Sequence, residues 1–396
     1  MYHRIYHNNT KANAVLFEGD QLLISSKIKE MFKTTTQGFW YDFSDFSTMY
    51  QDAAGTIPVT GVGQPIGLIL DKSKELLIGG ELWQDSSVST TGESSKVSTG
   101  VYRIYSSSGA YSSVQMSGLI AGSLYKLNLN IDSITQLGIG VSNEGTPTSI
   151  FNSLGQKTVY FFATGNLMVI KRAGTACDIQ VSNVSVKRVS GNHAYQTTSS
   201  SRPLLQKNSV TGDYYASFDG VDDFLQTSAV NFSTTDKISL FAGVRKLSDS
   251  AVTTVIEFSS IWTSFDGTFV IHAPSAASNP NVYSGSHGNA VANGTQANIV
   301  SGLPAPISLC LAAKHNISGD LSTLKVNGVS APTSTADKGS GNFGNYPLYI
   351  GRRGGTSLPF GGHIYSLIGF DHLVTDTESK LIEKEIAVAT GVILSA

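Results

Sequence analysis

The sequence predicts an all-β protein, made of tandem antiparallel β-sandwiches with one short helix at the C-terminal end. Three observations lead to this fold class. Charged residues make up 14% of the chain, against about 25% in an average soluble protein. Glycine accounts for 40 of the 396 residues, which favours a chain with many tight turns. Short runs in which apolar and polar residues alternate, as they do in half-buried strands, recur along the sequence.

The first 36 residues contain too little apolar sequence to form a core of their own. Residues 27–33 could form one or two helical turns before the Thr-rich break that follows. We expect residues 1–36 to pack on another domain or on a partner chain, as a docking or oligomerisation segment. Their apolar side chains include Ile5, Leu16, Phe17, Leu22, Leu23, Ile24 and Phe32.

Two units follow this segment. Residues 37–80 are an aromatic-rich leader in which turn signals separate short strands. Residues 81–190 predict a first β-sandwich, because period-2 runs recur there without a helix signal. The clearest run, residues 124–131, alternates over its whole length. The strands we expect are residues 100–105, 124–131, 137–141, 159–163, 167–171 and 179–189.

Residues 191–207 are rich in Ser and Thr and predict a linker. Residues 208–396 predict a second β-sandwich, in which Asn327-Gly328 after a short strand is the strongest hairpin signal. The strands expected there are residues 215–219, 238–245, 252–258, 268–272, 307–314, 323–326, 346–351 and 363–370. We expect the chain from about residue 207 onward to fold alone.

The C-terminal helix has signals at both ends. Thr375 and Glu378 match the capping box, in which each side chain accepts from the other residue's backbone N–H. Gly391 lies where a C-cap glycine belongs. The apolar stripe between them consists of Leu381, Ile382, Ile386 and Ala389.

Charge, hydrophobicity and cysteine content limit the classes of function that the chain can have. The net charge of −2 provides no basic excess for phosphate backbones, which argues against a nucleic-acid partner. No apolar run reaches the 18 residues of a membrane span, and residues 1–7 do not resemble a signal peptide. We therefore expect no membrane insertion and no ordinary secretion. Cys177 and Cys310 lie in separate apolar runs and are predicted to be buried thiols in different domains.

The second unit resembles a known family at both of its ends. It opens with Tyr215-Ala216-Ser217-Phe218-Asp219-Gly220-Val221-Asp222-Asp223-Phe224-Leu225. It closes with residues 360–371 as a strand and Leu373-Val374-Thr375-Asp376-Thr377-Glu378 as a helix start. Together these motifs resemble the concanavalin A-like jelly roll in its laminin-G-like form. The resemblance covers roughly residues 208–396.

The leader resembles a segment of bacteriophage and prophage virion proteins. Its matching residues are 39–48, with Trp40-Tyr41-Asp42 at their centre, then 51–56 and 63–67. The middle unit resembles the galactose-binding-like jelly roll of such proteins in its strand pattern and in residues 183–187. These resemblances imply a virion surface protein, of tail-fibre or receptor-binding type, that contacts host glycans. The first 36 residues are too short for an extended fibre shaft.

No catalytic signature is present in the sequence. It lacks Gly-x-Ser-x-Gly, His-Glu-x-x-His and the Glu-x-Asp-x-x-Glu of glycanases that share the concanavalin-like fold. Glu257 and Asp266 are conceivable as a carboxyl pair for glycoside hydrolysis. We therefore expect an adhesin that binds carbohydrate without cleaving it. The alternatives are a structural capsid-decoration or baseplate protein, which would show large apolar patches, and a capsule depolymerase, which would show paired carboxylates in a cleft.

Sugar binding needs flat aromatic faces together with planar polar groups. We look for both in turn-rich segments rather than in the alternating strands, and we expect binding to centre on Trp262. For each aromatic residue the alternative is core or interface packing. The candidates are Trp262, Phe265, Asp266, Tyr283, His287, Asn289, Arg352 and Arg353 in the second unit, with Trp83, Tyr105 and Tyr111 in the middle unit.

Three aspartates cluster around Gly220. Asp219, Asp222 and Asp223 could supply hard oxygen ligands to Ca²⁺. Alternatively, their side chains accept hydrogen bonds from neighbouring backbone N–H groups in a turn. No other cofactor is predicted. The expected partners are a host surface glycan, further copies of the chain in a homotrimer, and other virion proteins through residues 1–36, all on the virion surface.

Overall fold

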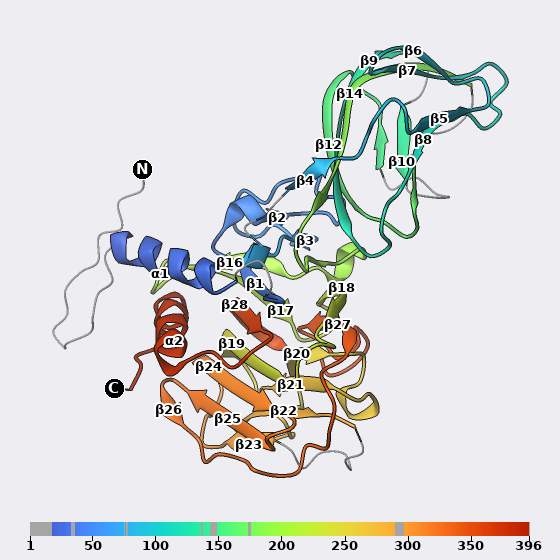
Figure 1. Cartoon of the computed structure of the whole chain (residues 1–396). Helices are drawn as coiled ribbons and strands as arrows, with labels where there is room; N and C mark the ends of the chain where they lie inside the picture. Colours follow the sequence, from blue (N-terminus) through green and yellow to red (C-terminus); the bar gives the residue numbers. More distant parts are fainter. Residues whose placement is uncertain are drawn as a thin grey trace.

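A computed structural model describes residues 18–32, 36–74, 76, 78–135, 138–142, 149–172, 176–289 and 297–395. These residues form two packed pairs of antiparallel sheets, and Figure 1 shows the two pairs as separate lobes. The predicted all-β class of stacked sandwiches is confirmed. No helix among these residues has the length and apolar character needed to cross a bilayer.

The larger lobe, here called the C-terminal sandwich, has two facing sheets (Figure 1). The first runs in the order β16 (Leu204–Lys207), β17 (Tyr214–Asp219), β28 (Gly361–Phe370), β19 (Lys237–Lys246), β24 (Ile307–Asn316), β25 (Leu321–Val326) and β26 (Val329–Ser330). The second runs β2 (Met49–Tyr50), β3 (Leu68–Ile69), β15 (Ala194–Tyr195), β18 (Leu225–Asn231), β27 (Asn345–Ile350), β20 (Thr254–Phe258), β21 (Thr268–His272), β22 (Val282–His287) and β23 (Ala297–Val300).

The leader belongs to this sandwich. Strand β1 (Gly38–Asp42) pairs with the C-terminal half of β28, along the edge whose other half pairs with β17. Phe39 and Tyr41 enter the core between the two sheets, where both are fully buried. The segment expected as a linker also contributes strands, because β15 and β16 fall within residues 191–207. Neither segment stands apart from the C-terminal sandwich.

The smaller lobe, here called the middle sandwich, is built on a second core. One sheet runs β12 (Gly155–Phe162), β9 (Leu124–Ile134), β14 (Cys177–Val189), β7 (Val101–Ser106) and β6 (Ser95–Ser98), with β4 (Ile78–Glu81) on β14. The other runs β11 (Ser149–Phe151), β10 (Ile139–Ser142), β13 (Leu167–Arg172), β8 (Ser113–Ser117) and β5 (Val88–Thr91). Inward residues of β9 such as Leu127 and Leu129 alternate with outward polar ones, as the period-2 pattern predicts.

Both helices of the described residues pack on the C-terminal sandwich. Helix α2 (Asp376–Thr390) begins with the predicted capping box at Thr375 and Glu378 and ends at Gly391 in the left-handed conformation. Helix α1 (Glu18–Met31) is longer than the one or two turns expected. Phe32, just after α1, is 5% exposed and stacks on Phe370 at 4.2 Å between ring centroids.

The apolar residues of the docking segment therefore divide into three groups. Ile24, Ile28 and Phe32 are buried against the C-terminal sandwich of the same chain. For Ile24 and Phe32 the structure therefore agrees with packing on another domain rather than on a partner chain. Their burial completes a small core with α2. Nothing is described for the side chains of Leu22 and Leu23. Ile5, Leu16 and Phe17 lie outside the described residues.

Two further local predictions are confirmed. Asn327 and Gly328 both have positive φ angles, of 53° and 81°, and they join β25 to β26 in a two-residue hairpin. Cys177 and Cys310 are buried free thiols in different cores.

A buried carboxyl group joins the leader to the segment that returns from the middle sandwich. Asp71 is fully buried, and its oxygens accept from the backbone N–H groups of Trp40, Ser73 and Asn192 at 2.7–2.8 Å. The backbone N–H of Asp71 donates to Nδ1 of His193 at 3.0 Å. Burial lowers the pKa of His193, which keeps that nitrogen free to accept. Three chain segments thus meet at one residue.

Removing this carboxyl group should destabilise the whole protein. Asp71→Ala leaves three buried backbone donors without an acceptor, and each unsatisfied donor costs about 1–3 kcal/mol. We expect the free energy of unfolding to fall by more than about 3 kcal/mol, measured by urea denaturation. The exposed Asp266→Ala serves as the control and should change it by less than about 0.5 kcal/mol. Equal stability of the two variants would contradict this account.

The fragment 207–396 should not fold as an independent domain, contrary to the expectation from sequence. It lacks β1, β2, β3 and β15, and all but one residue of β16, which supply edge pairing and core residues to both sheets. We expect a protease-sensitive product with poorly dispersed NMR signals. A fragment that starts at residue 18 should resist proteolysis. A well-folded 207–396 fragment would mean that the leader strands are dispensable.

Candidate functional site

Trp262, the predicted centre of binding, lies in the interior. It is 3% exposed and packs edge-on against Tyr283, with ring centroids 5.9 Å apart. Its carbonyl accepts from Nε2 of His287 at 2.7 Å, and His287 is itself 4% exposed. The prediction that these rings face a sugar is therefore corrected. The segment 259–267 lies over the face of β21 and β22 that points away from the main core. There the Trp262 ring packs against Val270 and Tyr283.

Glu257 and Arg353 form a buried ion pair beside this cluster. The Arg353 Nε donates to both carboxyl oxygens of Glu257, at 2.9 and 3.1 Å, and Glu257 also accepts from the Trp262 backbone at 2.7 Å. Burial raises the pKa of Glu257, and the Arg353 charge opposes that rise. Burial, aided by Arg353, lowers the pKa of the adjacent His272 to about 3. Arg353 is thus engaged in structure, and the prediction that it binds sugar is corrected.

The other predicted residues of the second unit are scattered. Arg352 donates to the carbonyls of Asp222 and Thr356, which fixes its loop. Phe265 is 40% exposed and tilts against the half-buried Tyr346, with ring centroids 5.5 Å apart. Asp266 is exposed at the same turn. Asn289 pairs through its backbone with Ser340. The loops therefore do not assemble into the predicted site around Trp262.

The aromatic residues predicted in the middle unit differ in their surroundings. Trp83 is 6% exposed and packs edge-on against Tyr102 in the core, so its predicted role in sugar binding is corrected. The guanidinium of Arg103 lies 4.1 Å from the ring centroid of Tyr105. Tyr111 is 52% exposed, with the Lys171 amine 6.0 Å from its ring. Tyr105 lies on β7, whereas Tyr111 lies in the loop that precedes β8.

The aspartates near Gly220 organise a turn. Their nearest oxygens all lie within 4.8 Å of one another. Asp219 accepts from the backbone of Val221 and Asp222, and Asp223 accepts from the backbone of Asp219. Burial, together with the two neighbouring carboxylates, raises the pKa of Asp223 to about 6. The turn interpretation accounts for these contacts, and no metal site is built on them.

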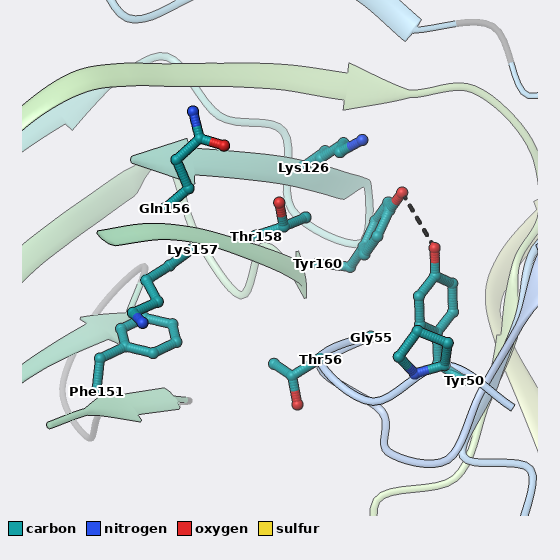
Figure 2. Close-up of a pocket in the computed structure, with 10 residues that line it drawn as sticks. Tyr50, Gly55, Thr56, Lys126, Phe151, Gln156, Lys157, Thr158 and Tyr160 are labelled. Carbon is teal, nitrogen blue, oxygen red and sulfur yellow. Dashed lines mark hydrogen bonds between the residues drawn. The ribbon is translucent and has the colours of Figure 1, made fainter. Parts of the chain in front are cut away.

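The structure instead offers a cleft at the junction of leader and middle sandwich. It encloses about 400 Å³, and Figure 2 shows side chains from both parts around it. The rings of Tyr50 and Tyr160 lie 5.2 Å apart, and their hydroxyl groups are joined at 3.4 Å (Figure 2). The lining residues are Tyr50, Gly55, Thr56, Pro58, Lys126, Phe151, Gln156, Lys157, Thr158 and Tyr160.

A tight turn of the leader forms one wall. Asp52 accepts from the backbone N–H groups of Thr56 and Ile57 at 2.9 and 3.1 Å, which closes the turn. Gly55 has a φ of +60°, and a Cβ there would stand 2.5 Å from the Tyr160 ring. The backbone N–H of Tyr160 donates to the carbonyl of Ala54 at 2.8 Å. The turn is thereby held against the edge strand β12.

The other wall continues into an outward polar face. On β12 and β9 the pairs Gln156–Asn130, Thr158–Asn128 and Tyr160–Lys126 stand directly opposite each other. Thr158 Oγ1 donates to Asn128 Oδ1 at 2.7 Å. On β14 the next residues are Ser182, Ser185 and Lys187, opposite Asn130, Asn128 and Lys126. The result is a shallow surface of amides and hydroxyls that ends at an aromatic ring.

These cleft residues were missed because candidates were sought in turns. The signal was present in the polar half of the alternating run 124–131, where the amides Asn128 and Asn130 follow Lys126. Sequence alone does not show that residues 50–58 close the end of this face.

No family model matches the chain, and no curated protein matches it. Solved structures that resemble it include the CBM40 of the Ruminococcus gnavus IT-sialidase, at 16% identity over 41% of this chain and 97% of that one, with a TM-score of 0.30. A SAP-like pentraxin from Limulus polyphemus matches at 13% identity over 44% and 80%, with a TM-score of 0.33. The botulinum neurotoxin serotype D binding domain matches at 9% identity over 48% and 50%, with a TM-score of 0.34. Likeness at this level carries no argument about what the chain binds.

The burial of Trp262 gives a direct test. Trp262→Ala should lower the free energy of unfolding by about 3–5 kcal/mol, as truncation of a core aromatic does. Phe265→Ala, three residues away and 40% exposed, should cost less than about 1 kcal/mol. Thermal and urea denaturation of both variants measure the difference. If the Trp262 variant has near-normal stability, its side chain is not part of the core and this account is wrong.

Proposed function

We propose that this chain binds carbohydrate without cleaving it, and that the cleft between the leader and the middle sandwich is the binding site. The observation that carries the proposal is the combination at the cleft of aromatic rings with a row of amides and hydroxyls. Sugars offer apolar C–H faces to rings and hydroxyl groups to planar polar side chains. Tyr50 and Phe151, both half-buried, supply the rings, and the buried Tyr160 packs against Tyr50. Gln156, Thr158 and Asn128 supply hydrogen-bonding groups on one surface.

The lack of cleavage is part of the proposal. The cleft's lining residues include no Asp or Glu, whereas glycoside hydrolysis generally uses two carboxyl groups. Glu257, the one buried carboxyl considered for catalysis, is held in its ion pair with Arg353. A capsule depolymerase is therefore the less favoured function.

The setting that we propose is the surface of a bacteriophage virion. It rests on the resemblance of the leader, and of the strand pattern in the middle unit, to virion proteins. The corresponding partners are a host surface glycan, other virion proteins and further copies of this chain. A trimer would suit a shallow site, because linked weak sites gain avidity. A capsid-decoration or baseplate role is the alternative, and the oligomeric state is measured by light scattering.

The test is glycan binding by the full-length chain and two cleft variants. Gln156→Ala and Thr158→Val change exposed side chains, so the fold should persist. Each should weaken binding about three- to tenfold, since each removes a hydrogen bond worth about 0.5–1.5 kcal/mol. Gln115→Ala, a half-buried glutamine of β8, is the matched control and should bind normally. A glycan array, followed by calorimetry on the glycans found, provides the measurement.

Two results would count against the proposal. Binding unaffected by the Gln156 and Thr158 changes would move the site elsewhere on the molecule. Release of oligosaccharides from host capsule by the purified protein would establish an enzyme, and its loss in Glu257→Gln would place the chemistry at that residue.

A further inference from the structure

We infer that the cleft selects an anionic sugar, one that carries a carboxylate or a sulfate group, over its neutral counterpart. This inference rests on the proposed function, because it names the class of glycan bound at the same site. It depends in addition on the two lysines that line the cleft.

Within the part of the chain that the structure describes, the lysines at and beside the cleft lack acidic partners. Lys126 and Lys157 line the cleft (Figure 2), and no lining residue is acidic. Lys126 stands directly opposite Lys187 on β14. Among the described residues, none of these three lysines has a carboxylate within ion-pair distance, whereas Lys72, Lys246 and Lys314 elsewhere each have one. The cleft is thus positive in a chain whose net charge is −2.

Like charges directly opposite on neighbouring strands destabilise a sheet. Glu81 is the residue of β4 that faces Lys187, yet its two oxygens accept from the Ser185 hydroxyl and the Val186 backbone at 2.6 and 2.8 Å. Asp52, below the cleft, is engaged in its own turn. Both carboxylates keep their negative charge, but they hydrogen-bond to neutral donors and form no ion pair with these lysines. An anionic ligand would supply a counter-charge in direct contact.

The position of Lys126 suits such a ligand. Its amine lies 5.7 Å from the centroid of the buried Tyr160 ring, and Tyr160 contacts the half-buried Tyr50. A sugar that contacts Tyr50 could therefore bring its anionic group to the amine. Lys157 is anchored through the Ser153 hydroxyl and the Leu154 carbonyl, at 2.9 and 3.0 Å. That anchoring reduces the side-chain freedom lost when an anion binds.

The experiment compares paired glycans on one array. Each neutral core is printed alone and with a sialyl, uronyl or sulfate group, and full-length protein is tested with Lys126→Gln, Lys157→Gln and Lys207→Gln. Lys207 is the matched control, since its amine also lies over a tyrosine ring, 5.4 Å from the centroid of Tyr214, in the other sandwich. We expect the acidic member of a pair to bind more tightly. Lys126→Gln and Lys157→Gln should each reduce that preference about three- to tenfold, and added salt should reduce it further.

The outcomes separate the two claims. Equal binding of acidic and neutral members, still weakened by Gln156→Ala, overturns the charge selection and leaves the proposed function in place. Failure to bind any glycan overturns both. Preference for sialyl or uronyl pairs identifies a carboxylate ligand, and preference for sulfated pairs identifies a sulfate ligand. If Lys126→Gln and Lys157→Gln both keep the full preference for acidic glycans, the charge selection does not arise at this cleft.

Discussion

Asp71 lies where the chain leaves the C-terminal sandwich and where it returns. Strands β3 and β15 are neighbours in one sheet, although the whole middle sandwich lies between them in sequence. The Asp71 carboxylate accepts from the Asn192 backbone N–H, and the Asp71 backbone N–H donates to His193, so the outgoing and returning segments are held together. The middle sandwich is thus an insertion whose two ends are fixed side by side, an arrangement that folded domains tolerate well. The same carboxyl group accepts from Trp40 and so positions β1 on β28.

The cleft depends on this junction. One wall belongs to the leader and the other to the inserted sandwich, so its shape requires that the two keep a fixed relation. The hydrogen bond from Tyr160 to Ala54 and the contact of the Tyr50 and Tyr160 rings provide local support. A second small core at the junction adds to it, formed by Leu68, Leu70, Leu124, Tyr160 and Val189. Binding at the cleft would therefore report on the integrity of the junction as well as on the lining residues.

Sequence reasoning succeeded where the signal is local and failed where it is not. The alternation in β9 and β14, the Asn327-Gly328 hairpin and the Thr375 capping box depend on neighbouring residues and were predicted. The leader was expected to hold short strands, but the pairing of β1 with β28 and of β3 with β15 was not predicted, because these partners lie more than 120 residues away. Trp262 was misplaced for a related reason. Its segment has the composition of an exposed turn, and only the pairing of β20, β21 and β22 shows that it covers a sheet face.

Strand β9 shows why the binding face and the core cannot vary independently. Leu127, Leu129 and Ile131 point into the middle core, while Lys126, Asn128 and Asn130 point outward. Because side chains alternate with period 2, a shift of one residue would exchange the two sets. The register that buries the three apolar residues is therefore the one that presents the amine and the amides to the cleft side. Burial of the apolar residues in the core thus fixes the positions of the polar side chains on the outer face. A shallow site can therefore hold its binding groups in defined positions without a deep pocket.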